Sequence, residues 1–248
     1  AGHGGVMSIY TFNDVMSITS CIFEDNHALV GGAVHIDLNN FFLTFESCLF
    51  SRNIASDSGG AIYLSKSNFF ITFQNTEFEY NKATHSSGGA VYFLLSNAHL
   101  DFTDCLFHAN IVENDNSVEE NKKLVGSLGG GAVFSHTLNR LISFSRTVFD
   151  SNIARFSSGG ACFFRTGHSD IAISSCRFVG NQAYDSGGAV NFMTFNTAVT
   201  LVDTEMTGNI AATAGGGAVF ALAFNSLTAT GTNMSSNQAP FGGALQFT

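Results

Sequence analysis

The chain has 248 residues and a formal net charge of −9, and 45% of its residues are apolar whereas only 12% are charged. This composition can supply a large hydrophobic core, and the negative charge argues against nucleic acid as a partner. No apolar run approaches the roughly 18 residues that a membrane-spanning helix requires, so we expect no membrane insertion by this segment.

Two short motifs alternate along the chain, and their spacing defines a repeat. The first motif is Phe-x-x-Asn, and the second is Gly-Gly-Ala followed by an aliphatic residue. Successive Asn residues of the first motif are 27 to 29 positions apart, with a single longer step of 42. A fixed period of this length is typical of solenoid proteins. The Asn residues of this column are Asn26, Asn53, Asn81, Asn110, Asn152, Asn181, Asn209 and Asn237.

Each repeat opens, after its Gly-Gly pair, with a predicted strand. In the second repeat, residues 34–36 alternate apolar, polar and apolar, and the same period of two recurs in the other repeats. This pattern indicates a strand with one buried face. A second strand with inward apolar residues follows at 43–45, and a third, short strand follows at 48–50.

Three strands in a repeat of about 28 residues, with no helical stretch between repeats, predict one coil of a parallel β-helix. We therefore expect residues 1–248 to form a single all-β domain. This domain would be a single-stranded right-handed parallel β-helix, a solenoid of about 8–9 coils with three strands per coil. The handedness follows from the rule that parallel crossover connections are overwhelmingly right-handed.

A second Asn column lies between the first and second strands of each repeat, with His168 replacing Asn in one repeat. We expect both columns to form ladders, in which each Asn adopts the left-handed backbone of a turn and bonds to the Asn above and below. The Gly-Gly pairs are expected to allow a sharp bend or a close backbone approach. The second column contains Asn13, Asn40, Asn68, Asn97, Asn139, Asn196 and Asn225.

The motifs resemble those of a known family. "GGAV", "GGAI", "GGAC" and "GGAL" alternate with "FEDN", "FSRN", "FEYN", "FHAN", "FDSN" and "FVGN". This pattern resembles the passenger domains of the chlamydial polymorphic outer membrane proteins and the broader set of right-handed parallel β-helix surface proteins. The resemblance covers essentially the whole chain, and it implies a secreted or cell-surface β-helix that acts in adhesion.

Three classes of function remain open. The first is a non-catalytic extracellular structural or adhesive solenoid, either a filament- or fibre-forming subunit or a segment of a larger surface protein. The second is a carbohydrate-active enzyme, a polysaccharide lyase or hydrolase, but the outward acidic residues are too scattered to predict any catalytic residue. The third is an ice- or surface-binding solenoid, suggested by hydroxyl residues such as Thr44 and Thr72 on the second strand. We predict no metal site and no cofactor.

Two features are candidate binding elements. An outward aromatic column in the first strand would form an apolar stripe that meets a partner, a glycan or the inserted loop. The long step between repeats is an insertion at 111–129, which we interpret either as a solvated acidic loop or as a recognition loop. The column contains Tyr63, Tyr92, Phe134, Phe163 and Phe220, and the acidic residues of the loop are Glu113, Asp115, Glu119 and Glu120.

The cysteines and the chain ends complete the pattern. Four of the five cysteines share one inward column, which favours buried free thiols over a disulfide framework.

Neither end shows a terminal cap, so we expect the end coils to be covered by flanking polypeptide of a longer chain or by a head-to-tail or lateral contact with a second copy. A surface receptor or a glycan is the other expected partner.

Overall fold

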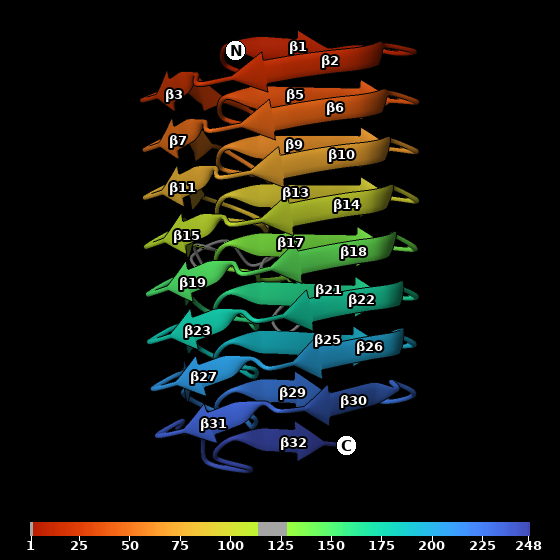
Figure 1. The fold of residues 1–248 in the computed structure, drawn as a ribbon. Coiled ribbons are helices and arrows are strands. Elements are labelled where there is room, and N and C mark those ends of the chain that lie inside the picture. The colour runs from red at the N-terminus through yellow and green to blue at the C-terminus, as the bar shows by residue number, and fades with distance from the viewer. Residues whose placement is uncertain (1, 114–127) are drawn as a thin grey trace.

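The computed structural model describes residues 2–113 and 128–248. In this part of the chain, every regular element is a strand, and the strands stack coil upon coil from the N-terminus to the C-terminus (Figure 1). No helix long and apolar enough to cross a membrane occurs among these residues.

The first sheet carries the strands that follow the Gly-Gly pairs. Its strands pair in parallel and in register, so that Val34 lies opposite Ile62 and Ile36 lies opposite Leu64. Within residues 2–113 and 128–248 its strands, in spatial order, are β1 (Met7–Ile9), β5 (Val34–Leu38), β9 (Ile62–Lys66), β13 (Val91–Leu95), β17 (Val133–Thr137), β21 (Cys162–Thr166), β25 (Val190–Thr194), β29 (Val219–Ala221) and β32 (Leu245–Phe247).

The second sheet is formed by the next strand of each coil, and it lies at the front of Figure 1. Its register places Leu43 opposite Ile71 and Phe45 opposite Phe73, which confirms the predicted inward pairs of these coils. Its strands in the described part of the chain are β2 (Asp14–Thr19), β6 (Phe41–Glu46), β10 (Phe69–Gln74), β14 (Ala98–Thr103), β18 (Arg140–Ser145), β22 (Ser169–Ser174), β26 (Thr197–Val202) and β30 (Leu227–Thr230).

The third sheet consists of three-residue strands whose central residue points inward, as Phe50 and Phe78 do. Its strands among the described residues are β3 (Ile22–Glu24), β7 (Leu49–Ser51), β11 (Glu77–Glu79), β15 (Leu106–His108), β19 (Val148–Asp150), β23 (Arg177–Val179), β27 (Glu205–Thr207) and β31 (Asn233–Ser235).

A fourth sheet of two-residue strands corrects the prediction of three strands per coil. It lies between the ladder Asn and the Gly-Gly pair, and two residues are too few to show a period of two in the sequence. Its strands within residues 2–113 and 128–248 are β4 (His27–Ala28), β8 (Ile54–Ala55), β12 (Lys82–Ala83), β16 (Ile111–Val112), β20 (Ile153–Ala154), β24 (Gln182–Ala183) and β28 (Ile210–Ala211).

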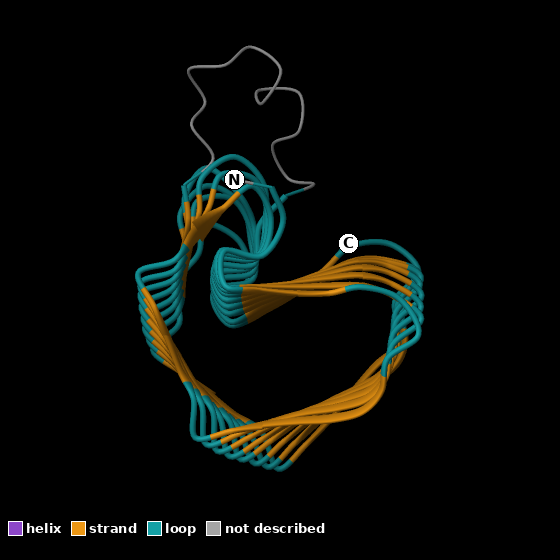
Figure 2. Ribbon diagram, turned by 90° about the horizontal axis from the view of Figure 1, so that it is seen from above, coloured by secondary structure: helices purple, strands orange, loops and turns teal. Residues whose placement is uncertain are grey.

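The coil is right-handed, as the sequence predicts. Seen in Figure 1, the strands of the first sheet run from left to right behind those of the second sheet, which run back from right to left while the chain descends. Seen from the N-terminal end in Figure 2, successive strands therefore turn clockwise as the chain recedes. The all-β parallel solenoid expected from the repeats is thus confirmed.

The core is filled by columns of apolar side chains from the first three sheets. Phe45 and Phe73 of the second sheet are fully buried, and their rings stack with centroids 5.1 Å apart. Phe50 and Phe78 of the third sheet stack in the same way at 5.0 Å. Burying a Phe side chain contributes about 1.5–3 kcal/mol, so these columns are a main source of stability along the rod.

The turns are made by single left-handed residues, but these are not the ladder Asn residues. Arg52, directly before Asn53, has a φ of 51°, and Asn39, directly before Asn40, has a φ of 55°. The expectation that the ladder Asn itself takes the left-handed backbone is therefore wrong. The residue before it makes the corner, because the Asn side chain must point inward to bond to its neighbours.

The two glycines of a pair have different roles. Gly59 has a φ of +65°, and a Cβ there would also clash with the backbone carbonyl of Ile62. At Gly60 a Cβ would clash with the carbonyl oxygen of Gly89 and lie 2.5 Å from the backbone nitrogen of Lys82 in β12. The first glycine therefore allows the bend, and the second allows the fourth sheet to approach.

Candidate functional site

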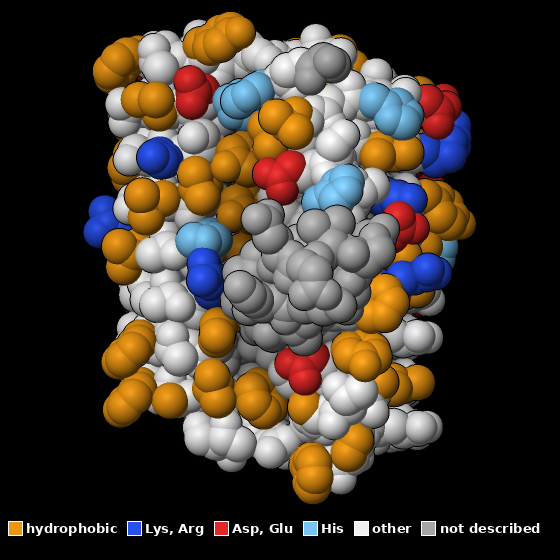
Figure 3. Space-filling view, turned by 180° about the vertical axis from the view of Figure 1, so that it is seen from behind, with side chains coloured by type: hydrophobic (Ala, Val, Ile, Leu, Met, Phe, Trp, Pro, Cys, Tyr) orange, Lys and Arg blue, Asp and Glu red, His pale blue; other side chains and the backbone are white. Residues whose placement is uncertain are grey.

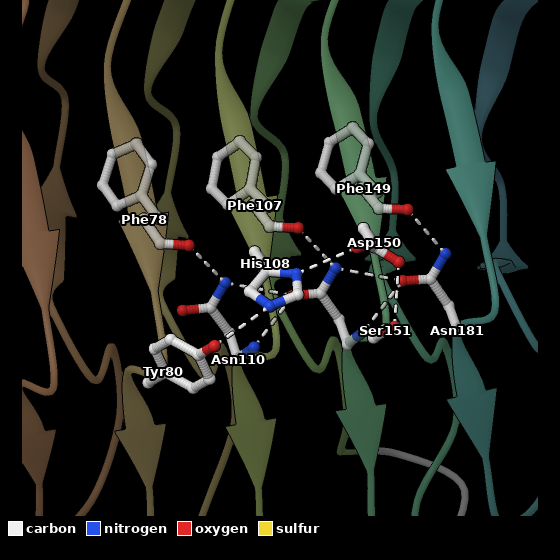
Figure 4. A network of polar contacts seen from close by, with 10 residues as sticks. Phe78, Tyr80, Phe107, His108, Asn110, Phe149, Asp150, Ser151 and Asn181 are labelled. Atoms are coloured by element: carbon white, nitrogen blue, oxygen red, sulfur yellow. Dashed lines mark hydrogen bonds and ion pairs between the residues drawn. The ribbon is translucent and has the colours of Figure 1, made fainter.

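The Asn residues of the Phe-x-x-Asn motifs, which recur most regularly in the sequence, use their side chains to form hydrogen bonds between neighbouring coils. Asn81 Oδ1 accepts bonds from the backbone N–H and from Nδ2 of Asn53, both at 3.0 Å. Asn81 Nδ2 donates to the carbonyl oxygen of Phe50 at 2.8 Å and to Asn110 Oδ1 at 3.0 Å. Figure 4 shows the same pattern one coil further, where Asn110 bonds to the carbonyl of Phe78. The motif thus joins a Phe carbonyl in one coil to an Asn amide in the next.

His168 takes the place of Asn in the second ladder. Its Nδ1 accepts a bond from the backbone N–H of Asn139 at 3.1 Å, and its Nε2–H donates to the carbonyl of Ser135 at 3.0 Å. Burial lowers the pKa of His168 from 6.5 to about 4. The imidazole is therefore neutral at pH 7 and serves as a ladder rung.

The inward cysteines and threonines that directly precede the strands of the third sheet form equivalent hydrogen bonds. Cys48 Sγ lies 3.4 Å from the carbonyl oxygens of both Glu46 and Ile18, which share its single S–H donor. One coil on, Thr76 Oγ1 donates to the corresponding carbonyl of Gln74 at 3.0 Å. All five cysteines are free, and all except the half-buried Cys21 are buried. This column needs a small side chain that donates one bond, which either residue supplies.

The predicted aromatic column does lie on the outer face of the first sheet, separate from the core. The rings of Tyr63 and Tyr92 stack at 5.0 Å, those of Tyr92 and Phe134 at 5.2 Å, and Phe163 meets Phe134 edge-on at 5.2 Å. Between Phe163 and Phe220 the column is interrupted by Asn191.

Most of this column is buried, so it is not open to solvent along its whole length. Phe134 and Phe163 are 0% exposed and Tyr92 is 6% exposed, whereas Tyr63 and Phe220 are half-buried. A strand's alternation places a side chain on one face but does not say what covers that face. Here the turn that leads into each Gly-Gly pair runs beside it (Figure 2), and the rings form a second apolar cluster with Leu94 and Met193.

The outer face of the second sheet carries a stack of aromatic side chains that is open to solvent. Phe42, Phe70 and His99 occupy the same position in three successive strands, each with a left-handed φ between 53° and 58°. Their rings stack at 4.8 Å between Phe42 and Phe70 and at 4.3 Å between Phe70 and His99. Phe42 is 49% exposed and Phe70 is 40% exposed. We call these three residues the front stack.

A groove continues the front stack toward the C-terminus. His99 is part of its wall. In later coils the same position holds smaller side chains, such as Leu141 and Ala198, and this leaves a hollow of about 430 Å³. Asp101 and Asp170 also line it, and Asp101 Oδ1 accepts a bond from Ser143 Oγ at 2.8 Å. The sequence contains a signal for this site, because Phe42 and Phe70 are outward aromatic residues one repeat apart. The sequence analysis did not identify it.

The hydroxyl residues of the second sheet do not form a continuous face. Thr72 is followed in register by Asp101, and Ala172 precedes Thr200. The groove lies over the same strands. The regular hydroxyl surface that would favour ice binding is therefore broken in the middle of the sheet.

A chain of polar contacts crosses the outer face of the third sheet (Figure 4). Tyr80 Oη lies 3.2 Å from His108 Nε2, His108 Nδ1 lies 2.9 Å from Asp150 Oδ2, and Ser151 Oγ donates to Asp150 Oδ1 at 2.8 Å. Tyr80, His108 and Asp150 thus follow one another in the order hydroxyl, base and carboxylate, which is the order found in activated nucleophiles. The side chains of His108 and Asp150 are 30% and 37% exposed, so the contacts lie open to solvent rather than in a site that excludes water.

The inserted loop lies almost entirely outside the described residues. Of its acidic residues, Asp115, Glu119 and Glu120 lie outside them. Glu113 lies within them and forms an ion pair with Lys82, with Oε2 at 2.7 Å from Nζ. No group of three or more His, Cys, Asp or Glu residues placed to hold a metal ion occurs within 2–113 and 128–248.

Comparison with known proteins agrees with the resemblance of the motifs. Residues 47–65 match the family described as the Chlamydia polymorphic membrane protein (Chlamydia_PMP) repeat. This segment contains one Phe-x-x-Asn motif, at 50–53, and the Gly-Gly-Ala-Ile motif at 59–62. The match and the β-solenoid support the resemblance to the chlamydial passenger domains, and they fit a surface-exposed protein. No curated protein and no solved structure matches the chain.

Proposed function

We propose that this chain is a non-catalytic adhesive β-solenoid of the cell surface, and that it binds its partner through the outer face of the second sheet. The observation that carries the proposal is the exposed front stack and the groove that continues it. A contiguous exposed apolar patch beside a groove is typical of an interaction site.

The fold itself does not require aromatic residues at these positions. The same left-handed position holds Leu141, Asp170 and Ala198 in later coils, so the backbone accepts other side chains there. Phe42 and Phe70 are not members of the buried core cluster, and they are 49% and 40% exposed. Their selection is therefore better explained by contact with a partner than by folding.

The body of the solenoid suits an extracellular support. Asn ladders and stacked Phe rings connect each coil to the next, so the front stack and the groove are held on a rigid sheet. Rigid, pre-formed surfaces bind with little ordering cost. A chain that also associates end to end would present many copies of this surface in a fibre.

The experiment compares two double variants with matched geometry. Phe42→Ala with Phe70→Ala removes the two phenylalanine rings of the front stack, and Phe195→Ala with Phe224→Ala removes another exposed stacked pair, whose rings are 4.9 Å apart. Binding of the labelled protein to cultured epithelial cells should fall at least about tenfold for the first variant, as expected for a central aromatic contact. Equal binding by both variants, with unchanged circular dichroism, would overturn the proposal.

A polysaccharide-cleaving enzyme is the second candidate, because Asp101 and Asp170 line the same groove as His99. Two carboxylates in one groove are the minimum that glycoside hydrolysis commonly uses. Release of reducing ends from a panel of polysaccharides, abolished by Asp101→Asn and Asp170→Asn, would establish this activity in place of simple binding.

A further inference from the structure

A further hollow lies at the corner between the first and second sheets, beside the second Asn ladder. The turns at this corner form the right-hand edge of Figure 1. The hollow has a volume of about 420 Å³, within the range of small-molecule sites. Its lining comes from four successive coils, so it extends along the rod for about 14 Å at the usual spacing of strands. The residues that matter for its chemistry are Ser67, Phe69, Ser96, Leu138, Arg140 and Ser169.

Small side chains at the corner leave this hollow open. The left-handed residue that makes the corner is serine at positions 67 and 96, whereas it is phenylalanine at 195 and 224, where two stacked rings lie 4.9 Å apart. Leu138, one coil beyond Ser96, leans toward the C-terminal end, since its Cδ2 lies 2.9 Å from the place of a Cβ on the glycine of the following coil. The space beside Ser67 and Ser96 is therefore left to solvent or to a ligand.

An aromatic ring lies on the N-terminal side of the hollow. Phe69 stacks on Phe41 of the preceding coil, with ring centroids 5.4 Å apart. In register with Phe69, the following coil carries Ala98, which has no ring to stack on the other face. Phe69 is half-buried and lines the hollow. Its ring can therefore contact an apolar surface of a ligand, such as the C–H face of a sugar ring.

The other side of the hollow carries a positive charge that has no partner in the described chain. Arg140 is exposed, and its side chain forms no ion pair or hydrogen bond with any described residue. Its neighbours in register are Ala98 and Ser169, so neither adjacent coil places a carboxylate opposite it. By contrast, Arg146 pairs with Asp104 of the preceding coil at 2.7 Å. The guanidinium of Arg140 is thus suited to bind a ligand carboxylate through two parallel bonds.

The surrounding charges favour a single anionic group. None of the described residues that line the hollow is acidic, and the exposed Lys66 precedes Ser67. Asp170, which follows Ser169, lines the groove of the second sheet instead. Figure 3 shows basic side chains on the left-hand flank of the middle coils, the flank that lies on the right in Figure 1. The formal net charge of −9 disfavours an extended polyanion, so one acidic group is the better match.

Three serine hydroxyls of the lining are available for bonds to a ligand. Ser67, Ser96 and Ser169 are half-buried, and their hydroxyls form no hydrogen bond within residues 2–113 and 128–248. The backbone N–H groups of Ser67 and Ser96 are already used, in bonds to the carbonyls of Leu95 and Thr137. A serine hydroxyl can both donate and accept a bond, which suits the hydroxyl groups of a sugar.

We propose that this hollow binds an acidic sugar, a pyranose ring that carries a carboxylate. Arg140 pairs with the carboxylate, Phe69 contacts the apolar face of the ring, and the serine hydroxyls bond to the hydroxyls of the sugar. A neutral sugar lacks the charge for Arg140, and a simple carboxylate lacks the hydroxyls. The hollow is separate from the front stack, so the proposal does not depend on the proposed adhesive function.

Calorimetric titration tests the proposal with matched probes. Methyl β-D-glucuronide and the methyl glycoside of N-acetylneuraminic acid are the acidic sugars. Methyl β-D-glucoside lacks the charge, and cyclohexanecarboxylate lacks the hydroxyls. We expect the tighter-binding acidic sugar to bind at least about tenfold more tightly than either control. Equal affinity for one of the controls, or no binding of either acidic sugar, would overturn the proposal.

Variants locate the binding and separate it from the adhesive surface. Arg140→Gln should weaken binding of the acidic sugar at least about tenfold, and Arg140→Lys should restore it only in part, because an ammonium group cannot form two parallel bonds. Arg155→Gln, a matched change of an exposed arginine beyond the fourth sheet, should leave the affinity unchanged. Phe69→Ala should weaken binding, whereas Phe69→Tyr should keep it. Unchanged affinity in Arg140→Gln, with a normal melting temperature, would contradict the assignment. The variant with Phe42→Ala and Phe70→Ala should still bind the sugar, so failure of either proposal can be recognised separately.

Binding to an array of glycans then identifies the source of the sugar. Retention on glycans that contain an acidic sugar, lost in Arg140→Gln, supports a cell-surface glycan as the natural ligand. Binding of the methyl glycoside without retention on any glycan supports a free sugar acid. Retention that Arg140→Gln leaves unchanged would contradict the site.

Discussion

The Asn ladder makes a quantitative prediction for Asn81→Ala. The substitution removes Oδ1, the acceptor of two bonds of 3.0 Å from the backbone N–H and the Nδ2 of Asn53. Both donors belong to a residue with 0% exposure, so the backbone N–H and one of the two Nδ2 hydrogens are left unpaired away from water, while the other Nδ2 hydrogen keeps its bond to the carbonyl of Phe23. At about 1–3 kcal/mol for each buried donor left unpaired, the free energy of unfolding should fall by about 2–6 kcal/mol.

The measurement is urea denaturation followed by circular dichroism, with Asn233→Ala as the control. Asn233 lies in β31 and is exposed, so its substitution should change the free energy of unfolding by less than about 0.5 kcal/mol. If both variants lose the same small amount, the ladder does not stabilise the solenoid, and the structural role assigned to the Phe-x-x-Asn motif is refuted.

Three further predictions concern single residues of the coils. The pKa of His168 is lowered to about 4 in the folded state, so below pH 6.5 the unfolded chain binds a proton that the folded chain does not. The free energy of unfolding should therefore be highest above pH 6.5 and fall by up to about 3 kcal/mol as the pH falls to 4. His168→Asn should remove this part of the pH dependence in melts at pH 4.5 and 7.5; an identical profile would disprove it. Gly60→Ala should destabilise the chain by at least about 2 kcal/mol in the same urea assay, because its Cβ meets backbone atoms of the next coil; a neutral effect would show that the coils move apart. Cys105→Thr should be nearly neutral in thermal melts, whereas Cys105→Val, which cannot donate to Phe73 and Thr103, should be less stable by about 1 kcal/mol; equal stability of the two would contradict the bonding role.

The core of the fold could be predicted because repetition amplifies a weak signal. A single alternation such as residues 34–36 is ambiguous, but the same alternation in register with 62–64 and later coils indicates a buried face. The third-strand Phe positions followed from the same columns, and the register of Phe50 with Phe78 confirms them.

The corners could not be predicted from residue type. Asp25, Arg52 and Tyr80 all adopt the left-handed backbone before a ladder Asn, yet they share no chemistry that would indicate it. The backbone of the solenoid imposes that conformation, and the outward side chain is free to vary. The two-residue strands of the fourth sheet escaped prediction because hydrogen bonds between coils define them, not a pattern within one coil.

The candidate sites show what sequence alternation leaves open. It placed Tyr63 and Phe134 correctly on one outer face, but the cover over Phe134 depends on how the turns before the Gly-Gly pairs pack. The groove of the second sheet depends on side-chain size in different coils, since Ala172 and Ala198 leave the space beside Asp170. Such a hollow is visible only when the coils are stacked.

The most direct test of the adhesive surface is site-specific photo-cross-linking during binding to cells. A benzophenone side chain placed at position 70, in the front stack, should cross-link the protein to a cell-surface component. The same side chain at position 195, in the other exposed aromatic pair, should give little or no product. Cross-linking from position 195 but not from position 70 would contradict the claim that the outer face of the second sheet is the binding surface.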